Sequence, residues 1–308
     1  MFDTKGFHEK VIEKIFRICD ILQRISLVEF TQERLSLYGG TSLNFLHFKG
    51  IPRLSIDIDF NFRDLKTGGW EKERNKIDDI IKKILYDLKY LKSDIKIQAS
   101  YPITRFDVYY LTENKEKDSI KIEIGYMRRM PLFKNDIKSS FNHFKTGEEI
   151  ELKTPISEEL FGNKFCTLFY RYEDETTISS KDLYDVYMIS KSTFNKKLFE
   201  TAIILDSLMR PEPRLYKKDL KKIVENISIN NKLLNLLRNG EVPKDLKLKS
   251  QDFINKYIIV VKEKYLDIID TFFDKQVFNP KLFKTFDSLN PDISSHPGIL
   301  WNLKKLEN

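Results

Sequence analysis

Two aspartates that follow a glycine-rich turn are the residues best suited to chemistry on phosphate. The turn reads Gly-Gly-Thr-Ser at residues 39–42, and Asp57 and Asp59 lie in the later segment RLSIDIDFNF. Successive side chains of a strand point to opposite faces. We therefore expect Asp57 and Asp59 to stand side by side on one face, with apolar residues on the other. Adjacent carboxylates repel each other, and Mg²⁺, which prefers oxygen ligands, would relieve that repulsion.

The glycine-rich turn predicts a place for phosphate. Glycine lacks a Cβ and tolerates positive φ, so backbone N–H groups there can approach an anion closely. A helix that begins at Thr41 or Ser42 would add the positive end of its dipole. The residues predicted to bind the nucleotide from this stretch are Gly39, Gly40, Thr41, Ser42, Arg53 and Ser55. Either motif alone is more often an ordinary turn or a solvated strand face, but together they predict metal-dependent phosphoryl or nucleotidyl transfer.

The elements that would position these residues are read from hydrophobic periodicity. Strands are predicted at residues 35–38, 54–62, 95–101, 105–111, 119–126 and 149–152. Helices are predicted at residues 6–30, 41–48 and 70–91. Residues 127–153 otherwise look irregular. This order predicts a mixed sheet with flanking helices in residues 1–153.

Glu123 is a candidate third carboxylate beside Asp57 and Asp59. It alternates with apolar residues in the strand predicted at 119–126, as does Lys121. It would either join the metal site or remain a solvated strand residue paired with Lys121. The sequence leaves both possibilities open.

Residues 154–308 are predicted to form an all-helical domain that completes the active-site cleft. Lys164 and Arg171 are seven residues apart in the helix predicted at 157–172, so they would share one face. Asp182 falls in the first turn of the next helix, where its carboxylate can point outward, and Ser179 precedes it with capping-box spacing. The alternative is a solvated basic stripe with Asp182 as a cap residue. The first motif makes us prefer a second group of active-site residues.

The remaining elements of this second domain are also predicted to be helices. Their expected ranges are residues 197–209, 217–226, 232–237 and 251–273. Little strand signal is present in this half of the chain, so the predicted fold class is α+β.

The composition is that of a folded, soluble protein. The 308 residues are 41% hydrophobic and 32% charged, with a net charge of +7. A basic balance is compatible with a nucleic-acid partner, although lysines interleaved with acids also suit simple solubility. The cysteines, Cys19 and Cys166, look like packed thiols. The sequence has no apolar run of about 18 residues, so we expect a cytoplasmic protein without a membrane span.

Two stretches resemble one family. GGTSLNFL followed by RLSIDIDF resembles the AbiEii-type nucleotidyltransferase toxins, which include the mycobacterial MenT relatives. Lys164, Arg171 and then Lys181-Asp182-x-x-Asp185 resemble the second motif of that family, with Lys181 where relatives often have arginine. The resemblance is strong at the turn and acidic strand, moderate from Lys164 to Asp185, and slight beyond Met209.

The resemblance implies an α+β fold, in which a polymerase-β-like nucleotidyltransferase domain precedes a helical domain. It implies that Asp57 and Asp59 are catalytic and bind Mg²⁺, that Lys164 is catalytic and contacts the nucleotide phosphates, that Arg171 also binds the nucleotide, and that Asp182 is a catalytic acid. It also implies an NTP substrate, a toxin of a type IV toxin–antitoxin or abortive-infection system, a tRNA 3′ end as acceptor, a block of translation and an AbiEi-like antitoxin partner.

Two other functions stay open from the residues alone. One is transfer of a nucleotide to a small molecule such as an antibiotic, against which a broad basic surface around the cleft would argue. The other is a catalytically silent protein that binds nucleotide or nucleic acid. The presence of Asp57, Asp59, Lys164 and Asp182 argues against the silent protein.

Overall fold

The structure is a computed structural model that describes residues 2–64, 69–100, 102–170, 179–210 and 229–307. The chain divides into two compact units. Unit 1 comprises Met1–Met130, Asp136–Pro155 and Asn235–Gly240. Unit 2 comprises Pro131–Asn135, Ile156–Leu234 and Glu241–Asn308.

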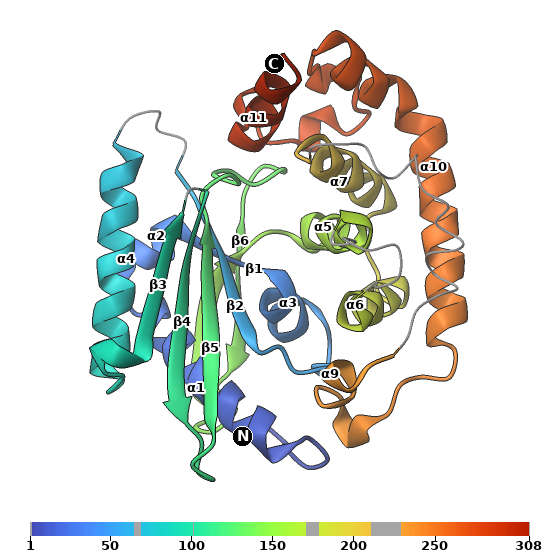
Figure 1. Cartoon of the computed structure of the whole chain (residues 1–308). Helices are drawn as coiled ribbons and strands as arrows, with labels where there is room; N and C mark the ends of the chain where they lie inside the picture. Colours follow the sequence, from blue (N-terminus) through green and yellow to red (C-terminus); the bar gives the residue numbers. More distant parts are fainter. Residues whose placement is uncertain (1, 65–68, 101, 171–178, 211–228, 308) are drawn as a thin grey trace. The chain divides into compact units, whose positions relative to one another are not determined.

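Unit 1 is built on a five-stranded mixed sheet with the strand order β1-β2-β5-β4-β3 (Figure 1). Its strands are β1 (Leu35–Tyr38), β2 (Asp57–Phe62), β3 (Ile95–Ser100), β4 (Ile103–Leu111) and β5 (Lys117–Gly125). β2 pairs in parallel with β5, and the other neighbours are antiparallel. The predicted strands are present, but β2 begins at Asp57 rather than at residue 54.

A second, two-stranded sheet corrects the prediction for residues 127–153. β6 (Ile137–Asn142) pairs antiparallel with β7 (Glu149–Thr154), and only β7 was predicted as a strand. In β6 only Phe141 is buried, so the segment lacks the alternating apolar pattern of a half-buried strand.

Two long helices of unit 1 pack on the apolar face of the five-stranded sheet. They are α1 (Glu9–Ser26) and α4 (Trp70–Asp87). Ile18 of α1 and Ile81 of α4 join Ile58, Phe106 and Ile122 of the sheet in one core cluster. Because a sheet that is covered on one face leaves the other for polar residues, this packing fixes which face carries the candidate site.

Short helical segments complete unit 1. They are α2 (Glu29–Arg34), α3 (Gly39–Ser42), a π-helical turn η1 (Leu43–His47), and the 3₁₀ turns η2 (Lys92–Asp94) and η4 (Arg238–Gly240). The helix predicted at 6–30 is thus two helices, and the one predicted from Thr41 begins at Gly39.

Unit 2 is helical. Its helices are α5 (Ser157–Tyr170), α6 (Ser180–Ser190), α7 (Lys196–Leu208), α9 (Asn231–Leu234), α10 (Leu246–Lys275) and α11 (Pro297–Leu306). Three 3₁₀ turns, η5 (Pro280–Leu282), η6 (Phe286–Ser288) and η7 (Ile293–Ser295), connect α10 to α11. Phe165 of α5, Phe199 of α7 and Phe253 of α10 pack ring against ring. The helix predicted at 217–226 lies outside the described residues.

The predicted α+β class, a mixed sheet followed by helices, is confirmed. Both cysteines are packed thiols, as predicted: Cys19 and Cys166 are free and buried, and burial raises the pKa of Cys19 to about 12. None of the described helices combines the length and apolar character that crossing a membrane requires.

Candidate active site

Asp57 and Asp59 stand on the polar face of β2, as the strand periodicity predicts. Both are half-buried, whereas Ile58, Phe60 and Phe62 between and beyond them are buried on the core face. Two residues along a strand rise about 7 Å, so the two carboxylates are close neighbours. The Asp57 carboxylate has no hydrogen-bond or ion-pair partner within the described ranges.

The glycine turn packs directly against this acidic strand. Gly39 has a φ of +66°, and a Cβ added there would overlap the Asp59 carboxylate. A Cβ at Gly40 would lie 2.8 Å from Ser55 Oγ and 3.0 Å from an Arg53 guanidinium nitrogen. Only glycine therefore allows the turn, the Asp59 carboxylate and the Arg53 and Ser55 side chains to approach so closely.

The two hydroxyls of the turn are already engaged inside the protein. Thr41 Oγ1 donates to the backbone oxygen of Asp57, and Ser42 Oγ lies 2.6 Å from Thr154 Oγ1. Both side chains are fully buried. In this arrangement Thr41 and Ser42 would contact a phosphate through their backbone N–H groups. The N–H groups of a first helical turn have no partners within the helix.

The sheet register brings further charged residues to the face of Asp57 and Asp59. Asp59 pairs with Glu123, which pairs with Arg105, and Asp57 pairs with Lys121. Lys121 Nζ lies 3.4 Å from Glu123 Oε1, so Glu123 is both beside Asp59 and paired with Lys121. The described residues contain no group of three or more His, Cys, Asp and Glu side chains arranged to hold a metal ion. The role of Glu123 as a third metal ligand stays a prediction.

In unit 2, Lys164 lies between two carboxylates. Its Nζ is 2.8 Å from Asp182 Oδ1 and 3.0 Å from Asp185 Oδ2. Lys164 comes from α5 and both aspartates from α6, and all three side chains are buried. The expected outward direction of Asp182 is therefore wrong, because the carboxylate turns inward to the ammonium.

The alternative, in which Lys164 belongs to a solvated basic stripe and Asp182 is only a cap residue, also fails. Ser179, the N-cap of α6, makes no side-chain capping hydrogen bond, and Lys164 is only 7% exposed. Arg171 lies outside the described residues. Asp185 was seen in the sequence only as part of the family motif, although its spacing of three from Asp182 already puts both on one helix face.

The class of protein to which this chain belongs is defined by a family match. The model of a family described as nucleotidyl transferase AbiEii toxin, type IV TA system, matches residues 20–275. The chain belongs to this AbiEii family, and it is a nucleotidyltransferase.

Solved structures with partial similarity include two nucleotidyltransferase-type proteins. MenT4, a nucleotidyltransferase toxin from Mycobacterium tuberculosis, is 15% identical with a TM-score of 0.48, over 82% of this chain and 95% of that chain. An antigenic nucleotidyltransferase-like protein from Paracoccidioides brasiliensis is 14% identical with a TM-score of 0.35, over 71% of this chain and 96% of that chain. No curated protein sequence matches the chain.

Proposed function

We propose that this chain is a Mg²⁺-dependent toxin that transfers a nucleotide from an NTP to RNA, at the 3′ end of tRNA, and so blocks translation. The observation that supports it most is the position of Asp57 and Asp59 on one strand face, with Gly39 packed against the Asp59 carboxylate. This arrangement offers oxygen ligands for a cation beside backbone N–H groups for phosphate.

The acidic pair fits a magnesium ion in its chemistry. Asp57 and Asp59 would hold the ion, since one or two carboxylates with substrate phosphates are its usual ligands. When bound, Mg²⁺ would neutralise phosphate charge and favour the deprotonated acceptor hydroxyl. Glu123 is proposed as a further ligand only if its ion pair with Lys121 opens.

The proposed reaction is a displacement at the α-phosphorus of the NTP. The acceptor hydroxyl oxygen forms a bond to the α-phosphorus, the bond from that phosphorus to the oxygen bridging to the β-phosphate breaks, and pyrophosphate leaves. Lys164 neutralises charge that develops on the phosphates. In leaving Asp182 for the phosphates, it would free that carboxylate to take the hydroxyl proton. Arg53, Ser55 and Arg171 are proposed to help bind the nucleotide.

The family implies a partner as well as a substrate. An antitoxin belongs to a type IV system, and we propose an AbiEi-like protein as the partner of this chain. We also propose that the toxin acts in the cytoplasm, where its tRNA acceptor is found.

The test is transfer of label from each of the four NTPs to tRNA with purified protein and Mg²⁺. We expect one or more NTPs to label intact tRNA but not tRNA whose 3′ end has been oxidised. Asp59→Ala should abolish labelling, whereas Asp79→Ala, at a side chain that is 74% exposed, should retain it. Absence of label from all four NTPs on any RNA would refute the RNA acceptor.

A further inference from the structure

A cavity lined by tyrosines lies at one end of the unit 1 sheet. Its volume is about 920 Å³, and its lining includes Tyr90, Tyr109, Tyr110, Arg17, Lys89 and Lys117. Ligand sites commonly have volumes of about 300–1,000 Å³. No residue of this cavity belongs to the acidic pair or the glycine turn.

One of the tyrosine rings is available for stacking. The Tyr110 ring is covered by the Arg17 guanidinium at 4.2 Å, and its hydroxyl donates to Asp118 Oδ2 at 3.0 Å. Tyr90 is buried at 8% exposure. Tyr109 points to the opposite face of β4 from Tyr110 and is 45% exposed. Because β3 pairs with β4 only as far as Val108, the cavity lies at an open edge of β4, where the Tyr109 ring can accept a planar partner.

The cavity also has two cations to offer. Lys89 and Lys117 are exposed, and neither makes an ion pair within the described part of the chain. Arg17 is already paired with Glu13. The lining carboxylate of Asp94 accepts a hydrogen bond from the Leu91 backbone N–H at 2.9 Å. An anionic ligand would therefore meet Lys89 and Lys117 first.

The register places Tyr109 on the same sheet face as Asp57. Asp57 is level with Lys121 and Asp107, and Tyr109 is two residues beyond Asp107 on β4. Two strand spacings and two residues along a strand give a separation of roughly 12 Å. Roughly three or four stacked nucleotides at about 3.4 Å each would span that distance.

We propose that this cavity binds a single-stranded segment of the RNA acceptor, with a base stacked on Tyr109 and phosphates at Lys89 and Lys117. An aromatic ring beside uncompensated cations is the combination that binds single-stranded nucleic acid. The inference rests on the proposed RNA acceptor, but it concerns binding, so it can be tested without catalysis.

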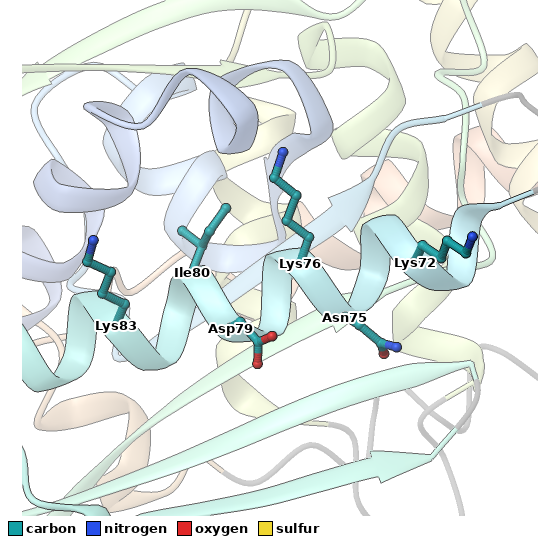
Figure 2. Close-up of a pocket in the computed structure, with 6 residues that line it drawn as sticks. All are labelled: Lys72, Asn75, Lys76, Asp79, Ile80 and Lys83. Carbon is teal, nitrogen blue, oxygen red and sulfur yellow. The ribbon is translucent and has the colours of Figure 1, made fainter.

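A second lysine-rich surface provides the comparison. A groove of about 500 Å³ along α4 is lined by Lys72, Asn75, Lys76, Asp79, Ile80 and Lys83. Figure 2 shows these six side chains on the helix. Those six side chains include no aromatic ring, and Lys76 Nζ already lies 3.8 Å from the centre of the Phe30 ring. Charge without a stacking platform makes this groove a control.

The experiment measures binding of a short fluorescent single-stranded RNA by anisotropy, without NTP. Tyr109→Ala should weaken binding by about 5- to 100-fold, and Tyr109→Trp should preserve it because stacking remains. Lys89→Glu with Lys117→Glu should weaken binding and flatten its salt dependence. Tyr86→Ala, at a similarly exposed tyrosine (43%) outside the lining, and Lys83→Glu should bind as the wild type does.

The outcomes separate this inference from the proposed function. If the wild type transfers nucleotide to tRNA while Tyr109→Ala binds RNA normally, the cavity inference is overturned and the function stands. If the RNA binds as expected but no nucleotide is transferred, the function fails and the cavity remains an RNA site. Equal losses of RNA affinity in Tyr109→Ala and Tyr86→Ala would also overturn the inference. The same holds if the wild-type protein binds no single-stranded RNA, or if the cavity binds only a protein partner.

Discussion

The acidic pair of unit 1 brings like charges together, whereas the buried ion pairs of unit 2 bring opposite charges together. Asp57 and Asp59 have the same charge and are half-buried on a strand face. Lys164 has two carboxylate partners, Asp182 and Asp185, within 3.0 Å in the interior of a helical unit. Within the described residues the Asp57 carboxylate has no ion-pair partner, whereas the Lys164 cluster contains charges of both signs.

This difference separates function from stability. Like charges on a partly solvated face add little to the free energy of unfolding, so their presence points to a ligand. Buried opposite charges depend on each other, because removing one leaves the other desolvated and uncompensated. Substitution of Asp57 should therefore change activity alone, and substitution of Lys164 should change stability too.

The largest effect is expected from Asp57→Asn. Nucleotide transfer should fall by at least about 100-fold, because an essential negative charge is lost. The free energy of unfolding should change by no more than about 0.5 kcal/mol, as at other sites without partners. Transfer assays and urea denaturation check both values, with Asp79→Asn as the exposed control. A loss of stability above that level would show that the acidic pair supports the fold.

Lys164→Met is expected to lower the free energy of unfolding by about 3–5 kcal/mol, since two buried carboxylates lose their cation. Adding Asp182→Asn and Asp185→Asn should restore much of that stability without restoring transfer. Urea denaturation measures the first effect. If Lys164→Met had the same free energy of unfolding as the wild type, the Lys164 ion pairs would not contribute to stability, and the two regions would not differ in this respect.

His47 gives unit 1 a pH-dependent stability. Burial lowers the pKa of His47 from 6.5 to about 4, and its Nε2 lies 3.2 Å from Thr154 Oγ1. The unfolded chain therefore binds more protons between these pH values, so the free energy of unfolding should fall as pH drops from 6.5 to 4. The loss is at most about 3 kcal/mol. His47→Asn should remove this component in denaturation series across pH, and His8→Asn, at an exposed position, should not.

The smallest loss of transfer activity is expected from Gly39→Ala, with Gly50→Ala as its control. Both glycines have positive φ, +66° and +75°, so each substitution should cost about 1–2 kcal/mol. Only a Cβ at Gly39 meets the Asp59 carboxylate, whereas Gly50 has no atom within 4 Å of an added Cβ. Transfer should therefore fall at least about 10-fold in Gly39→Ala alone. If Gly39→Ala and Gly50→Ala transferred nucleotide equally well, the contact between the turn and Asp59 would have no role in activity.

Much of the fold follows from local periodicity. Ile120, Ile122 and Ile124 alternate with polar residues, so the strand that contains them was predictable. β6 was not, because only one of its residues packs into the core. The break between α1 and α2 also escaped prediction, since apolar residues continue through it without a proline or glycine.

The sequence by itself determined which residues share a face in β2, because the period of a strand is a local property. It also determined that the turn with Gly39 and Gly40 comes before the strand with the two aspartates, and this order indicated nucleotidyl transfer. Only the tertiary structure decided that Glu123 lies beside Asp59 and that Gly39 abuts the Asp59 carboxylate. It likewise decided that Lys164 is buried between Asp182 and Asp185. Those relations depend on strand register and helix packing between residues far apart in the chain, which local patterns do not specify.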